Sequence, residues 1–200
     1  INQVGANDNL IFDGNSFIID ENGSKIKQLK SFSEDVSCWT IYQSSHLKNQ
    51  VQYSEISSIF DALVLGVKDY AKKCGFKTAL IGLSGGIDSA LVSAIAVAAL
   101  GSDNTYCVSM PSKWNSEHSK NDAEELAKRL KVDLKTISIE NLMSSFEESL
   151  VKNINFNAEG ITNQNIQSRL RGTILMALAN QEKHLFCLLY TSDAADDLTR

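Results

Sequence analysis

The chain has 200 residues, of which 43% are hydrophobic and 22% charged, values typical of a soluble globular protein and not of a disordered, fibrous or membrane-spanning one. Its 19 basic and 24 acidic residues give a formal charge of -5 without a clustered basic stripe, which argues against nucleic acid as the main partner. No uncharged apolar run is long enough to cross a membrane. The four cysteines show no paired spacing, which indicates reduced thiols of a cytoplasmic protein: Cys38, Cys74, Cys107 and Cys187.

The first fifty residues predict β structure followed by a linker. Apolar residues over 10–19 and 24–26 favour short strands, and Asn22-Gly23 between them is typical of a hairpin turn. Residues 31–50 are polar and lack a sustained period, so we expect a domain boundary near 36–50. The chain starts without a basic and then apolar leader, and we expect it to be an internal piece of a longer protein.

From residue 56 onward, the pattern changes to alternating helices and strands. Apolar residues at three- and four-residue steps predict a helix over 56–74 that ends at Gly75. Short apolar runs then predict three strands, at 78–83, 105–110 and 132–139. Helical patterns separate and follow these strands, at 89–100, around 123–130, at 142–151 and at 163–181. This alternation predicts an α/β fold with a doubly wound parallel sheet.

The turn between the first of these strands and its helix has the composition of an anion site. Gly85 and Gly86 allow backbone conformations that bring N–H groups close to a ligand, and the helix that follows offers the positive end of its dipole. Ser84 and Ser89 add hydroxyl donors, whereas Asp88 would repel a phosphate unless Mg²⁺ lay between them. The alternative is a tight strand-to-helix connection without a ligand, because short glycine motifs also occur by chance.

The segment Ser84-Gly85-Gly86-Ile87-Asp88-Ser89 resembles the pyrophosphate loop of the ATP pyrophosphatase family, which includes NAD, GMP, asparagine and argininosuccinate synthetases. Further segments resemble the NAD synthetases in particular: Met110–Lys113, Ser116–Ser119, Asp122-Ala123 and Asn165–Ala177. Two opening segments are similar to the end of the nitrilase-like glutaminase domain of the glutamine-dependent members: Asn2–Gly5 and Phe12–Phe17.

The resemblance implies an adenine nucleotide alpha hydrolase-like fold and a two-step reaction. ATP would adenylate the carboxylate of deamido-NAD with release of pyrophosphate, and ammonia from glutamine would then displace AMP to give NAD. By position, Asp88 would be the Mg²⁺ ligand and Asn165 would contact deamido-NAD, and no catalytic base is implied. Arg169 lies one turn along the same helix face from Asn165 and is a candidate for binding an anionic part of that substrate; the alternative is a solvated surface arginine. The ATP contacts would be Gly82, Leu83, Ser84, Gly85, Gly86, Ile87, Asp88 and Ser89. The full-length enzymes of this family generally form oligomers, so we expect a homo-oligomer.

We therefore expect four segments: the end of a glutaminase domain (1–36), a linker (37–50), the first part of a synthetase domain (51–186) and a non-native tail (187–200). The similarity stops abruptly after Phe186, and the residues that follow resemble a translated sequencing adapter; a genuine divergent tail is the alternative. Two other functions stay open, namely another ATP pyrophosphatase such as GMP synthetase, and a non-catalytic nucleotide-binding or assembly module.

Overall fold

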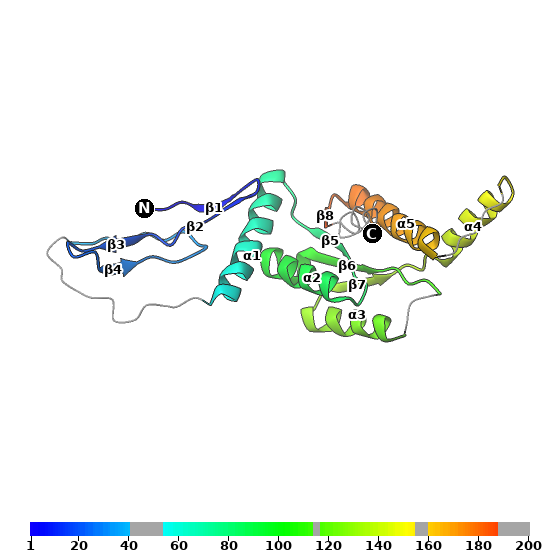
Figure 1. Ribbon diagram of the computed structural model, residues 1–200, viewed down its shortest axis with the longest axis horizontal. Helices are drawn as coiled ribbons and strands as arrows, with labels where there is room; N and C mark the ends of the chain where they lie inside the picture. Colours follow the sequence, from blue (N-terminus) through cyan, green and yellow to red (C-terminus); the bar gives the residue numbers. More distant parts are fainter. Residues whose placement is uncertain (41–53, 114–116, 155–159, 188–200) are drawn as a thin grey trace. The chain divides into compact units, whose positions relative to one another are not determined.

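A computed structural model describes residues 1–40, 54–113, 117–154 and 160–187 (Figure 1). The chain divides after Gly75 into two compact units. Most of the linker predicted at 37–50, and the predicted tail beyond Cys187, lie outside the described residues. None of the helices in the described ranges combines the length and apolar character needed to span a bilayer.

The first unit holds two antiparallel strand pairs and one helix. Strands β1 (Val4–Asn7) and β2 (Leu10–Asp13) pair, as do β3 (Phe17–Ile19) and β4 (Lys25–Gln28). Strand β1 was not predicted, and the predicted run over 10–19 is two strands rather than one. The β3–β4 turn is longer than Asn22-Gly23 alone, because the carboxylate of Asp20 accepts hydrogen bonds from the backbone N–H groups of Asn22 and Ser24.

Helix α1 (Glu55–Cys74) completes this unit and confirms the predicted helix and its end. The hydroxyl of Ser54 accepts a hydrogen bond from the N–H of Ser57 at the start, and Gly75 has a left-handed conformation with φ 79° at the end. The helix packs against the β1–β2 hairpin, and this close packing brings Gly66 against Ile11. The unit of Ile1–Gly75 therefore includes α1, whereas the sequence placed this helix at the start of the synthetase domain.

The second unit is built on a four-stranded parallel sheet. Its strands are β5 (Ala79–Gly82), β6 (Thr105–Ser109), β7 (Asp133–Thr136) and β8 (Leu185–Cys187), in the order β7-β6-β5-β8. The chain runs outward from β5 to β6 and β7, and then returns to place β8 on the other side of β5. This order is that of a doubly wound sheet, which confirms the predicted fold class.

Helices cover both faces of the sheet (Figure 1). Alternate strand residues point to opposite faces, so Leu80 and Val108 join one apolar cluster while Ile81 and Cys107 join the other. The first cluster includes residues of α4 (Glu140–Val151) and α5 (Gly160–Glu182). The second includes residues of α2 (Ile87–Leu100) and α3 (Glu117–Leu130), and the short 3₁₀ helix η1 (Ser102–Asn104) joins α2 to β6. Burial on both faces explains why β5 reads as a continuous apolar run.

Candidate functional site

The loop after β5 requires glycine at position 85. Gly85 has φ 82°, and a Cβ atom added there would overlap the carbonyl oxygen of Ser119 and lie 3.0 Å from its Cα. A side chain at Gly85 would therefore be strained both by its own backbone and by the start of α3. Gly86 differs, because its φ of -84° is ordinary and an added Cβ would meet only the Ser84 hydroxyl oxygen, at 3.3 Å.

Two serines brace this loop from within. The Ser89 hydroxyl donates to the carbonyl of Gly86 at 2.9 Å and accepts from the N–H of Ser84 at 3.3 Å, and the two hydroxyl oxygens lie 3.0 Å apart. The Ser84 hydroxyl also accepts from the N–H of Gly86 at 3.2 Å. Ser89 is only 3% exposed, whereas Ser84 is exposed. Ser84 is therefore the serine that is accessible to a ligand, and Ser89 holds the loop in shape.

Helix α2 starts directly after this loop and has no side-chain cap. Gly86 is its N-cap residue and has no side chain that could accept from the first N–H groups. The positive end of the helix dipole therefore faces the loop without a side-chain cap. Ile87 and Asp88 in the first turn are exposed, while Gly82 and Leu83 are buried beneath the loop. Of the eight predicted ATP contacts, those at the start of α2 are thus mainly exposed. Gly82, Leu83 and Ser89 are buried and support the loop from below.

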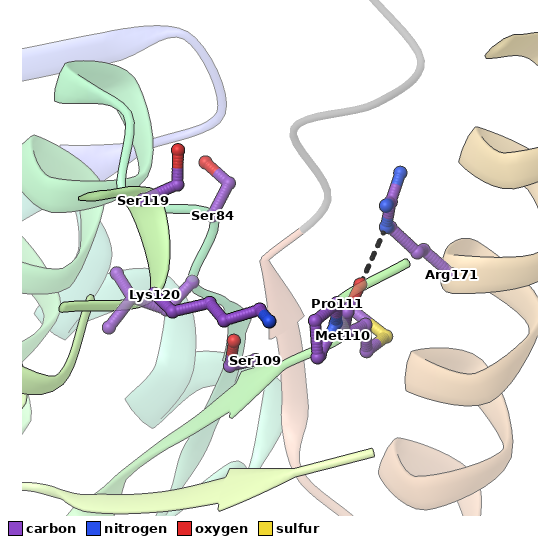
Figure 2. Close-up of a pocket in the computed structure, with 8 residues that line it drawn as sticks. Ser84, Ser109, Met110, Pro111, Ser119, Lys120 and Arg171 are labelled. Carbon is purple, nitrogen blue, oxygen red and sulfur yellow. Dashed lines mark hydrogen bonds between the residues drawn. The ribbon is translucent and has the colours of Figure 1, made fainter. Parts of the chain in front are cut away.

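The carboxyl end of the neighbouring strand β6 brings further groups to the same place. A small cavity of about 30 Å³ lies between the two strand ends (Figure 2), and its walls are formed by Leu83, Ser84, Ser109, Met110, Pro111, Ser119, Lys120 and Arg171. Figure 2 shows Lys120 of α3 and Arg171 of α5 on opposite sides of the Met110-Pro111 segment. Two cations from different helices thus line the cavity beside the open start of α2, an arrangement that favours an anion.

A hydrogen-bond chain fixes Arg171 and leads to a second hollow. Its Nε donates to the carbonyl of Met110 at 3.0 Å, and its Nη2 donates to Oε1 of Gln167 at 3.3 Å. The same Oε1 accepts from the Ser112 hydroxyl at 3.0 Å, and Nε2 of Gln167 donates to Asn163. Ser112, Gln167 and Asn163 also line a hollow of about 160 Å³ between α4 and α5, together with Lys113, Glu140, Met143, Ser144 and Glu147.

The structure does not bring the two predicted substrate residues of α5 to either cavity. Asn165 and Arg169 are exposed and line neither hollow. They lie two residues from Gln167 and Arg171, which places them on nearly the opposite side of the helix. Sequence reasoning missed Arg171, Lys120 and Gln167 as site residues. The sequence does indicate where the site lies, because the carboxyl ends of adjacent parallel strands meet at one edge of the sheet and each predicted strand is followed by a polar loop.

The described residues hold no group of three or more His, Cys, Asp or Glu side chains suited to a metal ion. Asp88 is exposed beside the phosphate-type loop and is the acidic side chain that the loop itself supplies. Mg²⁺ commonly takes one or two carboxylates and completes its coordination with substrate phosphates and water. A lone Asp88 therefore fits Mg²⁺ that arrives with a nucleotide, and does not fit a metal held by protein alone.

Residues 59–199 match the family model described as NAD synthase. The chain is 44% identical over 201 residues to a glutamine-dependent NAD(+) synthetase of Synechocystis sp., covering 98% of this chain and 36% of the relative. A glutamine-dependent NAD+ synthetase of Acinetobacter baumannii, solved in complex with adenosine diphosphate, is 36% identical with a TM-score of 0.84, covering 92% of this chain and 36% of that one. An NMN synthetase of Francisella tularensis is 31% identical with a TM-score of 0.60, covering 68% and 54%.

The chain thus spans about a third of the length of the curated relatives it matches, with 36% for the Synechocystis protein and 34% for that of Rhodobacter capsulatus. The family match begins inside α1 and extends through residue 199, so it covers residues 187–199 of the segment 187–200 that the sequence predicts to be a non-native tail.

Proposed function

Because the chain belongs to the NAD synthase family, we propose that it is part of a ligase that amidates deamido-NAD to NAD, with ATP as co-substrate and glutamine as the source of ammonia. The observation that carries the proposal is the cavity at the carboxyl ends of β5 and β6, which is lined by Ser84, Lys120 and Arg171. The Acinetobacter relative was solved in complex with ADP, which supports a nucleotide as a ligand of this chain.

The nucleotide phosphates are assigned to the loop between β5 and α2. Its glycines let backbone N–H groups approach phosphate oxygens, and the uncapped start of α2 adds unpaired N–H donors. Lys120 and Arg171, which also line the cavity, then neutralise negative charge on the phosphates. Donors fixed by the fold do not have to reorganise when pyrophosphate charge develops, and so they favour pyrophosphate as the leaving group.

Asp88 is proposed as the protein ligand of a Mg²⁺ ion that accompanies the nucleotide. When bound, the ion would screen the charge on the phosphate oxygens. Asp88 itself lies in the first turn of α2, directly after the Ser84–Gly86 loop, and its side chain is exposed.

Deamido-NAD is assigned to the second hollow of about 160 Å³. Hydrogen bonds from Arg171 and Ser112 to Gln167 connect this hollow with the phosphate cavity. One hydrogen-bonded set of residues would therefore hold both substrates. Glu140 and Glu147 on its wall are unfavourable neighbours for phosphate but are good acceptors for ribose hydroxyl groups. Asn165 and Arg169 stay proposed contacts for parts of deamido-NAD that extend over the exposed face of α5.

The chemistry needs no side-chain nucleophile. The substrate carboxylate attacks the α-phosphorus of ATP, pyrophosphate leaves, and ammonia then attacks the acyl carbon of the adenylate with release of AMP. Positioning of the carboxylate and neutralisation of phosphate charge supply most of the catalysis in such a sequence. We therefore assign no catalytic base, and we place the reaction in the cytoplasm, in a homo-oligomer of the full-length protein.

A mononucleotide acceptor is the second candidate. The Francisella relative is an NMN synthetase, and its 31% identity covers 68% of this chain. The same activation chemistry would apply to a nicotinate mononucleotide, which is smaller than deamido-NAD.

The complete gene product tests the proposal when it is incubated with ATP, Mg²⁺ and ammonium, and with deamido-NAD or nicotinate mononucleotide in parallel. We expect NAD, AMP and pyrophosphate in equal amounts, with deamido-NAD preferred. Preference for the mononucleotide would select the second candidate, and ATP consumption that yields ADP would refute both.

A further inference from the structure

A two-point clamp ties the N-terminal hairpin to α1. Oδ2 of Asp69 accepts a hydrogen bond from the backbone N–H of Ala6 at 2.8 Å, and Nζ of Lys73 donates to the backbone carbonyl of the same residue. Ala6 is buried, at 7% exposed. Asp69 and Lys73 are one helical turn apart and separated from Ala6 by more than sixty residues. The backbone N–H and the carbonyl group of Ala6 are thus both hydrogen-bonded to side chains of α1.

Glycines beside the clamp allow the β1–β2 hairpin and α1 to approach one another closely. Gly5 has φ 136°, and a Cβ atom added there would lie 3.1 Å from Oδ2 of Asp69. One turn earlier on α1, an added Cβ at Gly66 would lie 3.2 Å from the end of Ile11 on β2. Glycine therefore stands on both partners where they meet, which lets strand and helix pack more closely than larger residues would allow.

The clamp joins a residue outside the family match to two residues inside it. The family match begins at residue 59, so it includes most of α1 but excludes the hairpin. The glutamine-dependent Acinetobacter structure covers 92% of this chain, whereas the NMN synthetase covers 68%, close to the share that the family match occupies. At the other end of α1, the three residues Phe76–Thr78 lead directly into β5, which is followed by the phosphate-type loop.

We propose that Asp69 and Lys73 are positioning residues that couple glutamine use to synthesis by fixing the hairpin to α1. This inference rests on the proposed function. Ammonia produced from glutamine in another part of the protein reaches the synthetase site efficiently only while the parts keep a fixed arrangement. Ammonium added to the solution needs no such arrangement. Loss of the clamp therefore separates the two activities instead of lowering both.

The test is the ratio of glutamine-dependent to ammonium-dependent NAD formation in the complete gene product. In Asp69→Ala and Lys73→Met we expect the ammonium-dependent rate to change by less than about twofold, and the ratio to fall about fivefold or more, the lower end of usual coupling factors. Asp69→Asn keeps an oxygen that can accept the Ala6 N–H, so most of the ratio should be retained.

Asp61→Ala and Lys68→Met are the matched controls, because each removes the same charge from the same helix. Within residues 1–40, 54–113, 117–154 and 160–187, neither side chain makes a hydrogen bond or an ion pair. Their ratios should equal that of the unmodified protein. Thermal unfolding and circular dichroism of each variant show whether the fold is retained.

The outcomes separate the coupling role from the proposed function. A folded Asp69→Ala protein with an unchanged ratio, or with equal losses of both rates, would overturn the coupling role. If Asp69→Ala does not fold, Lys73→Met and Asp69→Asn decide by the same ratio. Absence of NAD formation from ammonium in the unmodified protein would instead refute the proposed function.

Discussion

Both edges of the parallel sheet carry polar side chains, which bond closely to one another at the amino edge and line two cavities at the carboxyl edge. At the amino edge, His184 lies just before β8, with Nδ1 2.6 Å from the hydroxyl of Thr78 and Nε2 3.0 Å from Oε2 of Glu182. The Tyr106 ring contacts the imidazole in a tilted arrangement, with ring centroids 4.7 Å apart and an angle of 34° between the ring planes. The space that remains there is about 10 Å³. Hydroxyl, imidazole and carboxylate satisfy one another, and His184 is only 8% exposed.

At the carboxyl edge, polar side chains line cavities. The cavity of about 30 Å³ and the hollow of about 160 Å³ both lie there, and α2 begins without a side-chain cap. The contrast teaches that residue types alone do not identify the site: a His, a Thr and a Glu that bond to one another leave almost no space, whereas Lys120 and Arg171 line a cavity.

The largest expected effect is on Gly85 at the carboxyl edge. Gly85→Ala forces a side chain into the Ser119 backbone at a left-handed φ, and we expect unfolding to become easier by about 1–3 kcal/mol. Because the loop must move to relieve the overlap, ATP affinity should fall by at least about tenfold, equal to one charge-assisted hydrogen bond. Thermal unfolding and calorimetric titration with ATP measure the two effects.

Gly86→Ala is its matched control. An added methyl group there meets only the Ser84 hydroxyl oxygen at an ordinary φ, so the free energy of unfolding should change by less than about 1 kcal/mol. Equal destabilisation by the two variants would contradict the loop geometry.

The next effect distinguishes two arginines of α5. Arg171→Met removes a cation from the cavity wall, and ATP affinity should fall about tenfold to a hundredfold. Arg169→Met removes the same charge from the exposed face and should leave ATP affinity unchanged, while any contact with deamido-NAD would raise the KM for that substrate alone. Equal loss of ATP affinity in both variants would show that net charge, and not position, attracts the nucleotide.

These arginines also mark the limit of what sequence reasoning reached. The strand, the loop and α2 follow from local pattern, because a buried apolar run, two glycines and a helix start stand next to one another. Arg171 joins the site through the order of strands, which places α5 over the sheet beside the end of β6. Strand β1 was missed for a related reason: its sequence Val4–Asn7 contains Gly5 and depends on pairing with β2 and on Asp69.

A moderate effect is expected at the amino edge. Thr78→Val leaves Nδ1 of the buried His184 without its partner and should lower the free energy of unfolding by about 1–3 kcal/mol. ATP affinity should stay the same, because neither residue lines the cavity of the carboxyl edge. Denaturant unfolding and ATP titration on the same sample check both statements. A loss of ATP affinity in a stable Thr78→Val protein would contradict the division between the edges.

The smallest effect concerns thiol chemistry. Burial raises the pKa of the Cys107 thiol, opposed by a hydrogen bond with Ser93 and assisted by Asp133 and Cys187, and burial also raises the pKa of Cys187. A raised pKa means less reactive thiolate at any given pH. Alkylation at pH 8, followed by mass spectrometry, should therefore label the exposed Cys38 and Cys74 before these two. Simultaneous labelling of all four would contradict the burial of β6 and β8.

The central claim is that the carboxyl edge of the sheet binds nucleotide phosphates, and calorimetric titration of the complete gene product with ATP and with AMP tests it most directly. ATP carries the two additional phosphates that the Ser84–Gly86 loop, Lys120 and Arg171 are placed to bind. The account predicts that ATP binds about tenfold or more tightly than AMP. The same difference should disappear in Arg171→Met combined with Gly85→Ala. Equal affinities for ATP and AMP in the unmodified protein would contradict the account.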